Sequence, residues 1–259
     1  MLRGSETSSG AAPADRERLR RASALVIGAG GLGCPAALAL VRAGVGRVVL
    51  ADDDQVELTN LHRQILFSDD DVGADKLDAA ARALDRERTE EQRIELVRSR
   101  FLPENARALA RDADIVLEGA DNFATKFLAA DACALEHRPV VHGAGIRWLA
   151  TALSVAPGGR PCYRCLFEDL PGGDAAPNCA TAGVMGPVVG FAGALMADLA
   201  LSWLTGDDTR AGRIFTFDGW RERLREVPIT PRADCALCGP RPRITRLDEA
   251  LYLGDECRA

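Results

Sequence analysis

Lysine is nearly absent from this sequence, although positive charge is not. Lys76 and Lys126 are the two lysines among 32 basic residues, and the others are arginines. Arginine serves well as a surface cation, so a bias toward it needs no special explanation. The two remaining lysines are therefore the better candidates for positions that require a compact ammonium group.

A basic excess and an N-terminal apolar run are also missing. The net charge is −6 and the isoelectric point is about 5.2, which argues against generic binding to nucleic acid or anionic membranes. The first 20 residues are small and polar, then charged, so no signal peptide is expected and the protein is predicted to be cytoplasmic. Its eight cysteines then predict reduced thiols, for a metal or for catalysis rather than for disulfides.

One apolar segment, residues 184–204, approaches the length of a membrane span. It contains Asp198 and Pro187 and has no flanking basic clusters. These features favour a buried core helix or a subunit-interface helix over a membrane helix.

Apolar runs alternate with helical patterns over the first 146 residues. Predicted strands cover residues 24–27, 47–51, 94–97, 113–117 and a segment from 139, and predicted helices cover 35–44, 75–87, a segment from 103, and 124–136. This order predicts an α/β, doubly wound, Rossmann-like and mostly parallel sheet. Residues 149–155 and 213–217 are predicted to extend it as antiparallel strands, and the Gly/Pro-rich residues 166–181 as an exposed loop.

A glycine loop follows the first predicted strand directly. Gly28, Gly30 and Gly33 stand at the GxGxxG spacing, between that strand and a helix, which is typical of a phosphate site at a helix N-terminus. Asp52 ends the next strand, where an acid accepts a hydrogen bond from a ribose hydroxyl. The sequence therefore predicts nucleotide binding.

Three charged residues favour ATP over NAD. Arg63 and Lys76 offer cations for a triphosphate and a departing pyrophosphate, although ordinary surface cations remain the alternative at both positions. Asp121 follows the fourth strand, where its carboxylate is placed to bind Mg²⁺, and the alternative is a cap for the next helix.

Two CxxC pairs lie far apart in the chain. Cys162, Cys165, Cys235 and Cys238 supply four thiolates, which close a tetrahedral zinc site and leave no open coordination position. The zinc would be structural; a pair of redox motifs is the alternative. Cys179 precedes a predicted helix, whose positive end would lower the thiol pKa, and the alternative is a small buried or unused cysteine.

At these residues the chain resembles the ThiF/MoeB/HesA adenylyltransferases, bacterial relatives of ubiquitin-activating enzymes, and the Asp-rich strand end and the Asn178 motif lean toward the ThiF branch. The resemblance extends over about residues 23–239 and rests on motifs that occur in order: Asp52-Asp53-Asp54, Thr59-Asn60-Leu61-His62-Arg63-Gln64, Lys76, Ala120-Asp121-Asn122, Cys162-Tyr163-Arg164-Cys165, and Asn178-Cys179-Ala180-Thr181-Ala182-Gly183.

The resemblance implies a role for each motif. The nucleotide site would include Gly28, Gly30, Gly31, Gly33, Asp52, Asp54, Asn60, Arg63, Gln64, Lys76, Asp121 and Asn122. Arg63, Lys76 and Asp121 would serve catalysis, with Asp121 holding Mg²⁺, and the four paired cysteines would hold Zn²⁺. Cys179 would bond to the activated partner or relay sulfur.

The resemblance also implies a domain plan. Residues 1–22 would be a disordered or variable segment, 23–239 a single adenylation domain and 240–259 a short tail. Within the domain, residues 23–146 would bind the nucleotide and residues 147–239 the zinc and the carrier. Without a following rhodanese-like domain, the sulfur donor, a cysteine desulfurase or rhodanese, is expected to be a separate protein.

The implied function is ATP-dependent adenylylation of a small ubiquitin-like sulfur carrier of the ThiS/MoaD type, ending in Gly-Gly, by a homodimer. Two departures bear on it: Glu118 stands where an Asp is usual, and the family's N-terminal Arg-Tyr-x-Arg-Gln type motif, whose arginine reaches the neighbouring subunit's site, is missing. Arg16, Arg18, Arg20 and Arg21 stand in that segment instead. The alternatives are a degenerate, zinc-stabilised nucleotide-binding scaffold and an NAD-dependent oxidoreductase.

Overall fold

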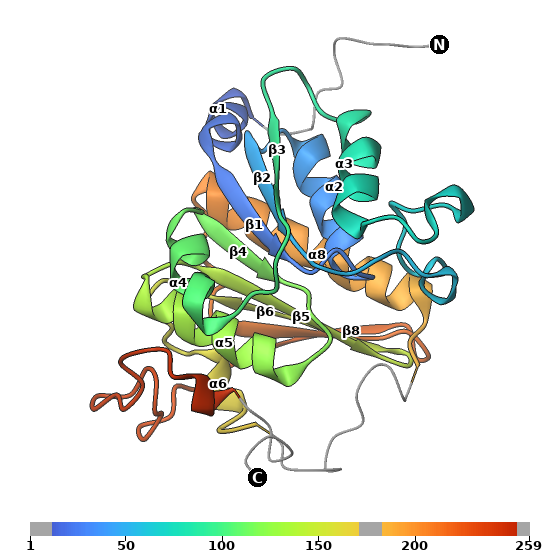
Figure 1. The fold of residues 1–259 in the computed structure, drawn as a ribbon. Coiled ribbons are helices and arrows are strands. Elements are labelled where there is room, and N and C mark those ends of the chain that lie inside the picture. The colour runs from blue at the N-terminus through green and yellow to red at the C-terminus, as the bar shows by residue number, and fades with distance from the viewer. Residues whose placement is uncertain (1–11, 171–182, 253–259) are drawn as a thin grey trace.

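The protein is built on one eight-stranded sheet, seen in a computed structural model that describes residues 12–170 and 183–252 (Figure 1). The strand order is β3-β2-β1-β4-β5-β6-β7-β8. The strands are β1 (Ser23–Ile27), β2 (Arg47–Ala51), β3 (Arg93–Val97), β4 (Ile115–Glu118), β5 (Val140–Ile146), β6 (Leu149–Val155), β7 (Arg213–Asp218) and β8 (Arg223–Pro228). The pairs among β1 to β5 are parallel and the pairs from β5 to β8 are antiparallel, as the sequence predicts.

Helices cover both faces of the parallel part of the sheet. They are α1 (Pro13–Arg21), α2 (Gly33–Ala43), α3 (Lys76–Asp85), α4 (Pro103–Arg111), α5 (Phe123–Leu135), α6 (Tyr163–Leu166) and α8 (Gly186–Thr205), with short 3₁₀ helices η1 (Leu58–Asn60), η2 (Asp69–Asp71) and η4 (Glu249–Leu251). Side chains alternate along β1 because the side-chain period of a strand is two. Ala24 and Val26 join the cluster formed with α2, α3 and α8, and Leu25 and Ile27 join the one formed with α4 and α5.

Helix α8 has the length and hydropathy of a membrane span. It nevertheless packs against α2, β5 and β6, where Met196, Ala197 and Ala200 are buried. Gly143 of β5 is required there, because a Cβ at this position would lie 2.2 Å from the Met196 sulfur. The segment is thus a core helix of this fold, in agreement with the sequence-based prediction.

Three elements differ from the expectations. Residues 13–21 of the segment expected to be variable form α1, and Leu19 of this helix is buried. Strand β8 was not predicted, because all six of its residues are exposed and the apolar pattern is correspondingly weak. Beyond Cys238, Ile244 and Tyr252 are buried, so the C-terminal segment packs on the domain.

Helices α4 and α5 are joined by a cluster of two arginines and one carboxylate. Arg107 and Arg111 of α4 lie 2.5 and 2.7 Å from the carboxylate of Glu136, whose side chain is 7% exposed. Hydrogen bonds from Arg111 and then Arg107 lower the pKa of Glu136 to about 2. The cluster thereby holds together two helices that flank the cavity described below.

Glu136→Gln is expected to reduce stability only at neutral pH. The folded-state pKa lies below the unfolded value of about 4.3, so the carboxylate stabilises the fold above that pH and loses its contribution as pH falls toward 2. Because both arginines are half exposed, we expect a loss of about 1 kcal/mol at pH 7 in urea unfolding. An equal loss at pH 7 and pH 3 would contradict this account.

Candidate active site

A cavity of about 740 Å³ lies at the carboxyl ends of β1 to β4. This is the edge at which doubly wound sheets bind ligands, and the volume is typical of a small-molecule site. Nearly all of the predicted nucleotide-site residues line it: Gly28, Gly30, Gly31, Asp52, Asp54, Asn60, Arg63, Gln64, Lys76, Asp121 and Asn122. The structure therefore brings together residues that are spread over about a hundred positions of sequence.

The glycine loop connects β1 to α2 and requires glycine at two positions. Gly28 has φ +87°, in the left-handed region, and a Cβ at Gly33 would lie 1.8 Å from the Gly28 carbonyl oxygen. Gly33 itself does not line the cavity, so its role is close packing of the helix start on the loop. Leu32 gives α2 no side-chain cap, but the N–H groups of Cys34 and Ala36 already donate to the carbonyls of Gly30 and Leu32. An anion would therefore bind to the backbone amides of the glycine loop that precede them.

Asp52 joins the glycine loop to the end of β2. One carboxylate oxygen accepts a hydrogen bond from the Ala29 N–H at 2.6 Å, and the other accepts one from the Asp54 N–H at 2.8 Å. A carboxylate has about four acceptor positions, so capacity remains for a ribose hydroxyl. Asp52 is thus fixed in place by the loop it would serve.

Neither predicted phosphate cation is an ordinary surface charge. Lys76 is 6% exposed, and its Nζ donates to Asp54 Oδ2 at 2.8 Å. Arg63 lies against Gly31 of the glycine loop and donates to Asn60 Oδ1 at 2.5 Å. Among the described residues no carboxylate forms an ion pair with Arg63, so its charge faces the cavity without a neutralising partner.

The structure separates the two predicted roles at the start of α5. Asn122, not Asp121, caps the helix, because its Oδ1 accepts a hydrogen bond from the Thr125 N–H at 2.8 Å. Within residues 12–170 and 183–252, Asp121 has no hydrogen-bond or ion-pair partner for its exposed carboxylate at the cavity. The helix-cap alternative for Asp121 is therefore wrong, and an oxygen ligand suited to Mg²⁺ is free.

Gln64 carries a further sign of a polar ligand. Its side chain is 3% exposed and lines the cavity, and its Oε1 is buried without a hydrogen-bond partner among the described residues. Such an orphaned acceptor costs free energy unless a ligand or a water donates to it.

A buried ionic cluster behind the cavity escaped the sequence analysis. Glu118 is fully buried; Lys126 Nζ lies 3.0 Å from its Oε2, His142 Nδ1 lies 3.2 Å from the same oxygen, and the Ala120 N–H donates to Oε1. Burial alone would raise the pKa of Glu118, but Lys126 and His142 outweigh it and keep this pKa below its usual value. Burial lowers the pKa of His142, so the imidazole is neutral at pH 7. The sequence signals for this site were the scarcity of lysine and the glutamate at position 118, and neither of them indicated an ionic cluster.

Lys126→Met is expected to lower the free energy of unfolding by about 3 kcal/mol at pH 8, because it leaves a buried carboxylate without its cation. Without Lys126, burial would raise the pKa of Glu118 in the folded protein above its pKa in the unfolded chain. The free energy of unfolding of the variant would then be highest below the unfolded pKa and would fall as the pH rises above it. Urea unfolding of the variant at pH 5 and pH 8 tests this. The matched control, Glu118→Gln with Lys126→Met, should be more stable than Lys126→Met and lack its pH dependence. Equal stability of the two variants would contradict the assignment.

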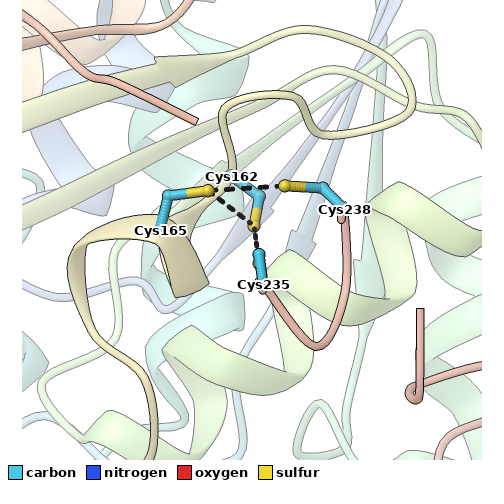
Figure 2. Close-up of side chains that lie close together, drawn as sticks. All are labelled: Cys162, Cys165, Cys235 and Cys238. Carbon is cyan, nitrogen blue, oxygen red and sulfur yellow. Dashed lines mark hydrogen bonds between the residues drawn. The ribbon is translucent and has the colours of Figure 1, made fainter. Parts of the chain in front are cut away.

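The four paired cysteines form one cluster (Figure 2). The Sγ atoms of Cys162 and Cys235 are 3.5 Å apart, those of Cys165 and Cys238 are 3.4 Å apart, and all four lie within 4.8 Å of one another. Four sulfurs bound tetrahedrally at 2.3 Å are separated by about 3.8 Å, so the arrangement fits zinc. Burial and the neighbouring thiols raise the pKa of Cys162, which a bound cation would offset.

The cluster draws its ligands from two distant segments. Cys162 is the N-cap residue of α6 and Cys165 lies within this helix, whereas Cys235 and Cys238 belong to the loop after β8. Leu237 and Ile244 pack against it. The convergence of all four thiols at one point favours a metal site over two separate redox pairs.

The remaining cysteines have other surroundings. Cys34 and Cys133 are fully buried, and burial raises the pKa of Cys34 to about 12, which removes any reactive thiolate there. Cys179, the predicted relay cysteine, lies outside the described residues, as does Cys257.

The arginines of α1 lie away from this chain's own cavity. The backbone N–H of Gly46, just before β2, donates to the Leu19 carbonyl, which places α1 at the amino ends of the strands. Arg20 pairs with Glu91 and Arg21 with Glu17. An arginine of α1 therefore cannot complete the cavity of its own chain.

Comparisons with known proteins agree with this architecture. A profile of the ThiF family matches residues 7–237. The chain is 40% identical over 232 residues to "Adenylyltransferase and sulfurtransferase MOCS3" of Anopheles gambiae, covering 89% of this chain and 52% of that protein. It is 38% identical over 228 residues to "SAMP-activating enzyme E1" of Haloferax volcanii, covering 88% and 84%. The chain thus spans about half the length of the MOCS3 relatives and most of the archaeal one.

Solved structures show the same fold. The crystal structure of E. coli MccB with MccA-N7isoASN superposes with a TM-score of 0.77 at 22% sequence identity, and the match covers 87% of this chain and 69% of MccB. At that identity the similarity establishes the fold alone.

Proposed function

This chain belongs to the ThiF family, and on that premise we propose that it is an ATP-dependent adenylyltransferase for a small ubiquitin-like sulfur carrier of the ThiS/MoaD type. It would activate the carrier's C-terminal Gly-Gly carboxylate as an acyl-adenylate, ready for later sulfur transfer. The names of the two relatives, "Adenylyltransferase and sulfurtransferase MOCS3" and "SAMP-activating enzyme E1", support this substrate class.

One observation carries the proposal: the cavity joins a glycine loop and two inward cations, Arg63 and Lys76, in a site without histidine among its described lining residues. Adenylylation suits such a site. The carboxylate oxygen bonds to the α-phosphorus of ATP, and the bond from that phosphorus to the bridging oxygen breaks, so that pyrophosphate leaves with the electron pair. A terminal carboxyl with a pKa of about 3.5 is already ionised, so no general base is required.

Under this proposal, each group of residues in the cavity has its own role in the reaction. The glycine loop and the start of α2 hold the phosphates, Asp52 orients the ribose, and Arg63 with Lys76 neutralises the charge that develops on the leaving pyrophosphate. Asn60 orients Arg63 through their hydrogen bond. Asp121 would hold Mg²⁺, which supplies further charge neutralisation when bound. Catalysis rests on positioning and electrostatics.

Exchange of labelled pyrophosphate into ATP tests the reaction. We expect exchange with Mg²⁺ and a cognate carrier ending in Gly-Gly and almost none without the carrier, since the carboxylate belongs to the partner. ATP binding without exchange, in the presence of several folded carriers, would instead establish a nucleotide-binding scaffold. Family membership leaves the NAD-dependent oxidoreductase without support, and comparing the affinities for ATP and NAD checks this directly.

Cys179 is proposed to act after adenylylation. Its thiolate would displace AMP from the acyl-adenylate and form a thioester with the carrier, or it would take the outer sulfur of a persulfide on a separate desulfurase or rhodanese, releasing that protein's thiolate, and pass this sulfur on. Cys179→Ala is therefore expected to retain pyrophosphate exchange and to lose most of the sulfur transfer to the carrier, since the two steps use different atoms. Mass spectrometry of the carrier would quantify its thiocarboxylate. Loss of exchange itself would contradict this role and assign Cys179 to the ATP site or to the fold.

The proposal also includes a cytoplasmic homodimer. Because the arginines of α1 lie away from their own cavity, any such arginine that serves an active site must come from a second subunit.

A further inference from the structure

The cavity has two ends of different chemistry. Arg63, which lies against Gly31 of the glycine loop, and Lys76 give one end its positive charge. The other end is lined by the segment after β3 and the start of α4, where Phe101, Leu102 and Pro103 are apolar and Arg100 and Glu104 are charged. Leu128, in the second turn of α5, adds a further apolar side chain. In the sheet β2 lies between β1 and β3, so Asp52 stands between the glycine loop and the segment after β3 that holds Phe101. Since ribose connects phosphate and base, the apolar end is the place for the base.

The C-terminal segment closes this apolar end. Glu249 and Tyr252 line the same cavity as the glycine loop, although they lie more than two hundred residues from it in sequence. Tyr252 is 7% exposed and belongs to the same apolar cluster as Phe101 and Leu128. Its ring therefore forms part of the wall that a base would contact.

A buried chain of polar groups fixes the Tyr252 ring. Its hydroxyl donates to Asp131 Oδ2 at 2.8 Å, and Asp131 is fully buried in α5. Arg164 donates to both oxygens of Asp131, through Nε and Nη2 at 2.8 Å each, and is 3% exposed. Since a buried ion pair is costly unless its remaining hydrogen-bonding positions are satisfied, the Tyr252 hydroxyl is tied to this carboxylate.

The same series of polar contacts connects Tyr252 with the cysteine cluster. Arg164 stands between Cys162 and Cys165 in the first CxxC pair, and its guanidinium stacks at 4.6 Å over the Phe127 ring of α5. Its backbone is thus held by the cluster while its side chain holds Asp131. With its hydroxyl engaged by Asp131, Tyr252 offers the cavity a flat apolar ring.

We propose that Tyr252 is a positioning residue for the nucleotide base, held at the cavity wall by the buried Asp131–Arg164 pair. The assignment rests on the proposed function for the identity of the ligand, ATP. It makes the C-terminal segment a part of the nucleotide site, and it predicts that Tyr252 affects the binding of the base and not that of the phosphates.

Titration calorimetry with ATP and with inorganic tripolyphosphate separates the two ends. On the full chain, with zinc content checked, Tyr252→Ala is expected to weaken ATP binding by about tenfold, the loss that corresponds to about 1.4 kcal/mol, and to leave tripolyphosphate binding unchanged. Tyr252→Phe, which keeps the ring and loses only the bond to Asp131, should weaken ATP binding about threefold. Arg63→Ala should weaken both ligands.

Leu251→Ala is the matched control, because Leu251 neighbours Tyr252 in the C-terminal segment and does not line the cavity. It should bind ATP as the parent does. Unchanged ATP affinity in Tyr252→Ala would overturn the proposal, and so would a parallel loss of ATP and tripolyphosphate binding. If Tyr252→Ala does not fold, Tyr252→Phe decides: its ATP affinity must fall while its tripolyphosphate affinity holds.

The assay contains no carrier, so it is independent of adenylylation. Normal ATP binding that depends on Tyr252, combined with no exchange for any carrier, would refute the proposed function and leave this assignment standing. Carrier-dependent exchange that proceeds normally in Tyr252→Ala at limiting ATP would support the proposed function and refute the assignment of Tyr252.

Discussion

Cys235→Ser is expected to lose bound zinc and about 5 kcal/mol or more of unfolding free energy, since structural zinc binding contributes directly to folding. The parent chain should carry about one zinc, held by Cys162, Cys165, Cys235 and Cys238, as the single cluster of four sulfurs indicates. A serine hydroxyl is a poor replacement for a thiolate. The three remaining thiols would then lie close together and largely buried without a cation.

Metal analysis and urea unfolding measure the two effects together. Cys133→Ala is the matched control, because Cys133 is buried in α5 and belongs to a different apolar cluster. It should retain its zinc and lose only about 1 kcal/mol, the cost of a small cavity. Protein prepared without chelators that contains no zinc would refute the site, as would a Cys235→Ser variant of unchanged metal content.

The consequence of metal loss should extend beyond stability. Residues 162–165 and 235–238 come from segments on either side of α8, and the cluster joins them together with the Arg232–Glu168 ion pair. Arg164 is part of that junction and bonds to α5, which begins beside Asp121. A chelator should therefore loosen one wall of the nucleotide cavity as well as the cluster itself.

Much of the parallel sheet could be predicted because its strands are buried on both faces. Ala24 to Ile27 are apolar without alternation, and the glycines that follow fix the turn into α2. Strand β8 could not be found in this way, since all of its side chains are exposed and its apolar residues Leu224 and Val227 stand three positions apart, which does not match the two-residue period of a strand. Helix α1 was missed for a similar reason, because Leu19 is its only buried residue.

The residues of the candidate site also differ in whether a local sequence pattern could reveal them. Residues near the glycine loop, such as Asp52 and Asp121, could be placed because parallel strands bring their carboxyl ends to one edge. Glu118 and His142 required the register between β4 and β5, in which they are direct partners. Tyr252 required tertiary packing, because no local pattern says that a C-terminal segment returns to the first half of the chain.

Asp121→Ala and Arg63→Ala are each expected to lower carrier-dependent pyrophosphate exchange by about 100-fold, the scale for losing one preorganised electrostatic contact. Asp121 has a free carboxylate at the cavity, and Arg63 has no carboxylate partner among the described residues. Neither substitution therefore breaks an ion pair between described residues, and the fall in exchange would report the lost contact with the nucleotide. Variants that retain full exchange would remove these residues from the chemistry.

Lys76→Arg is the sharper substitution, because the chain uses arginine at nearly every other basic position. Lys76 is buried at the N-terminus of α3, and its ammonium meets Asp54 at 2.8 Å. A guanidinium is larger and planar and cannot occupy the same point, so we expect a loss of exchange of at least about tenfold despite the conserved charge.

Arg82→Lys on the same helix is the matched control, since Arg82 is exposed and pairs with Asp71 on the surface. It should leave exchange unchanged. The loss in Lys76→Arg would then depend on position 76 and not on the exchange of lysine and arginine in general. If Lys76→Arg were equally harmless, the ammonium would be incidental and Arg63 would be the principal cation for the phosphates. If it alone abolished exchange while ATP still bound, Lys76 would act on the departing pyrophosphate, where charge develops only as the bond breaks.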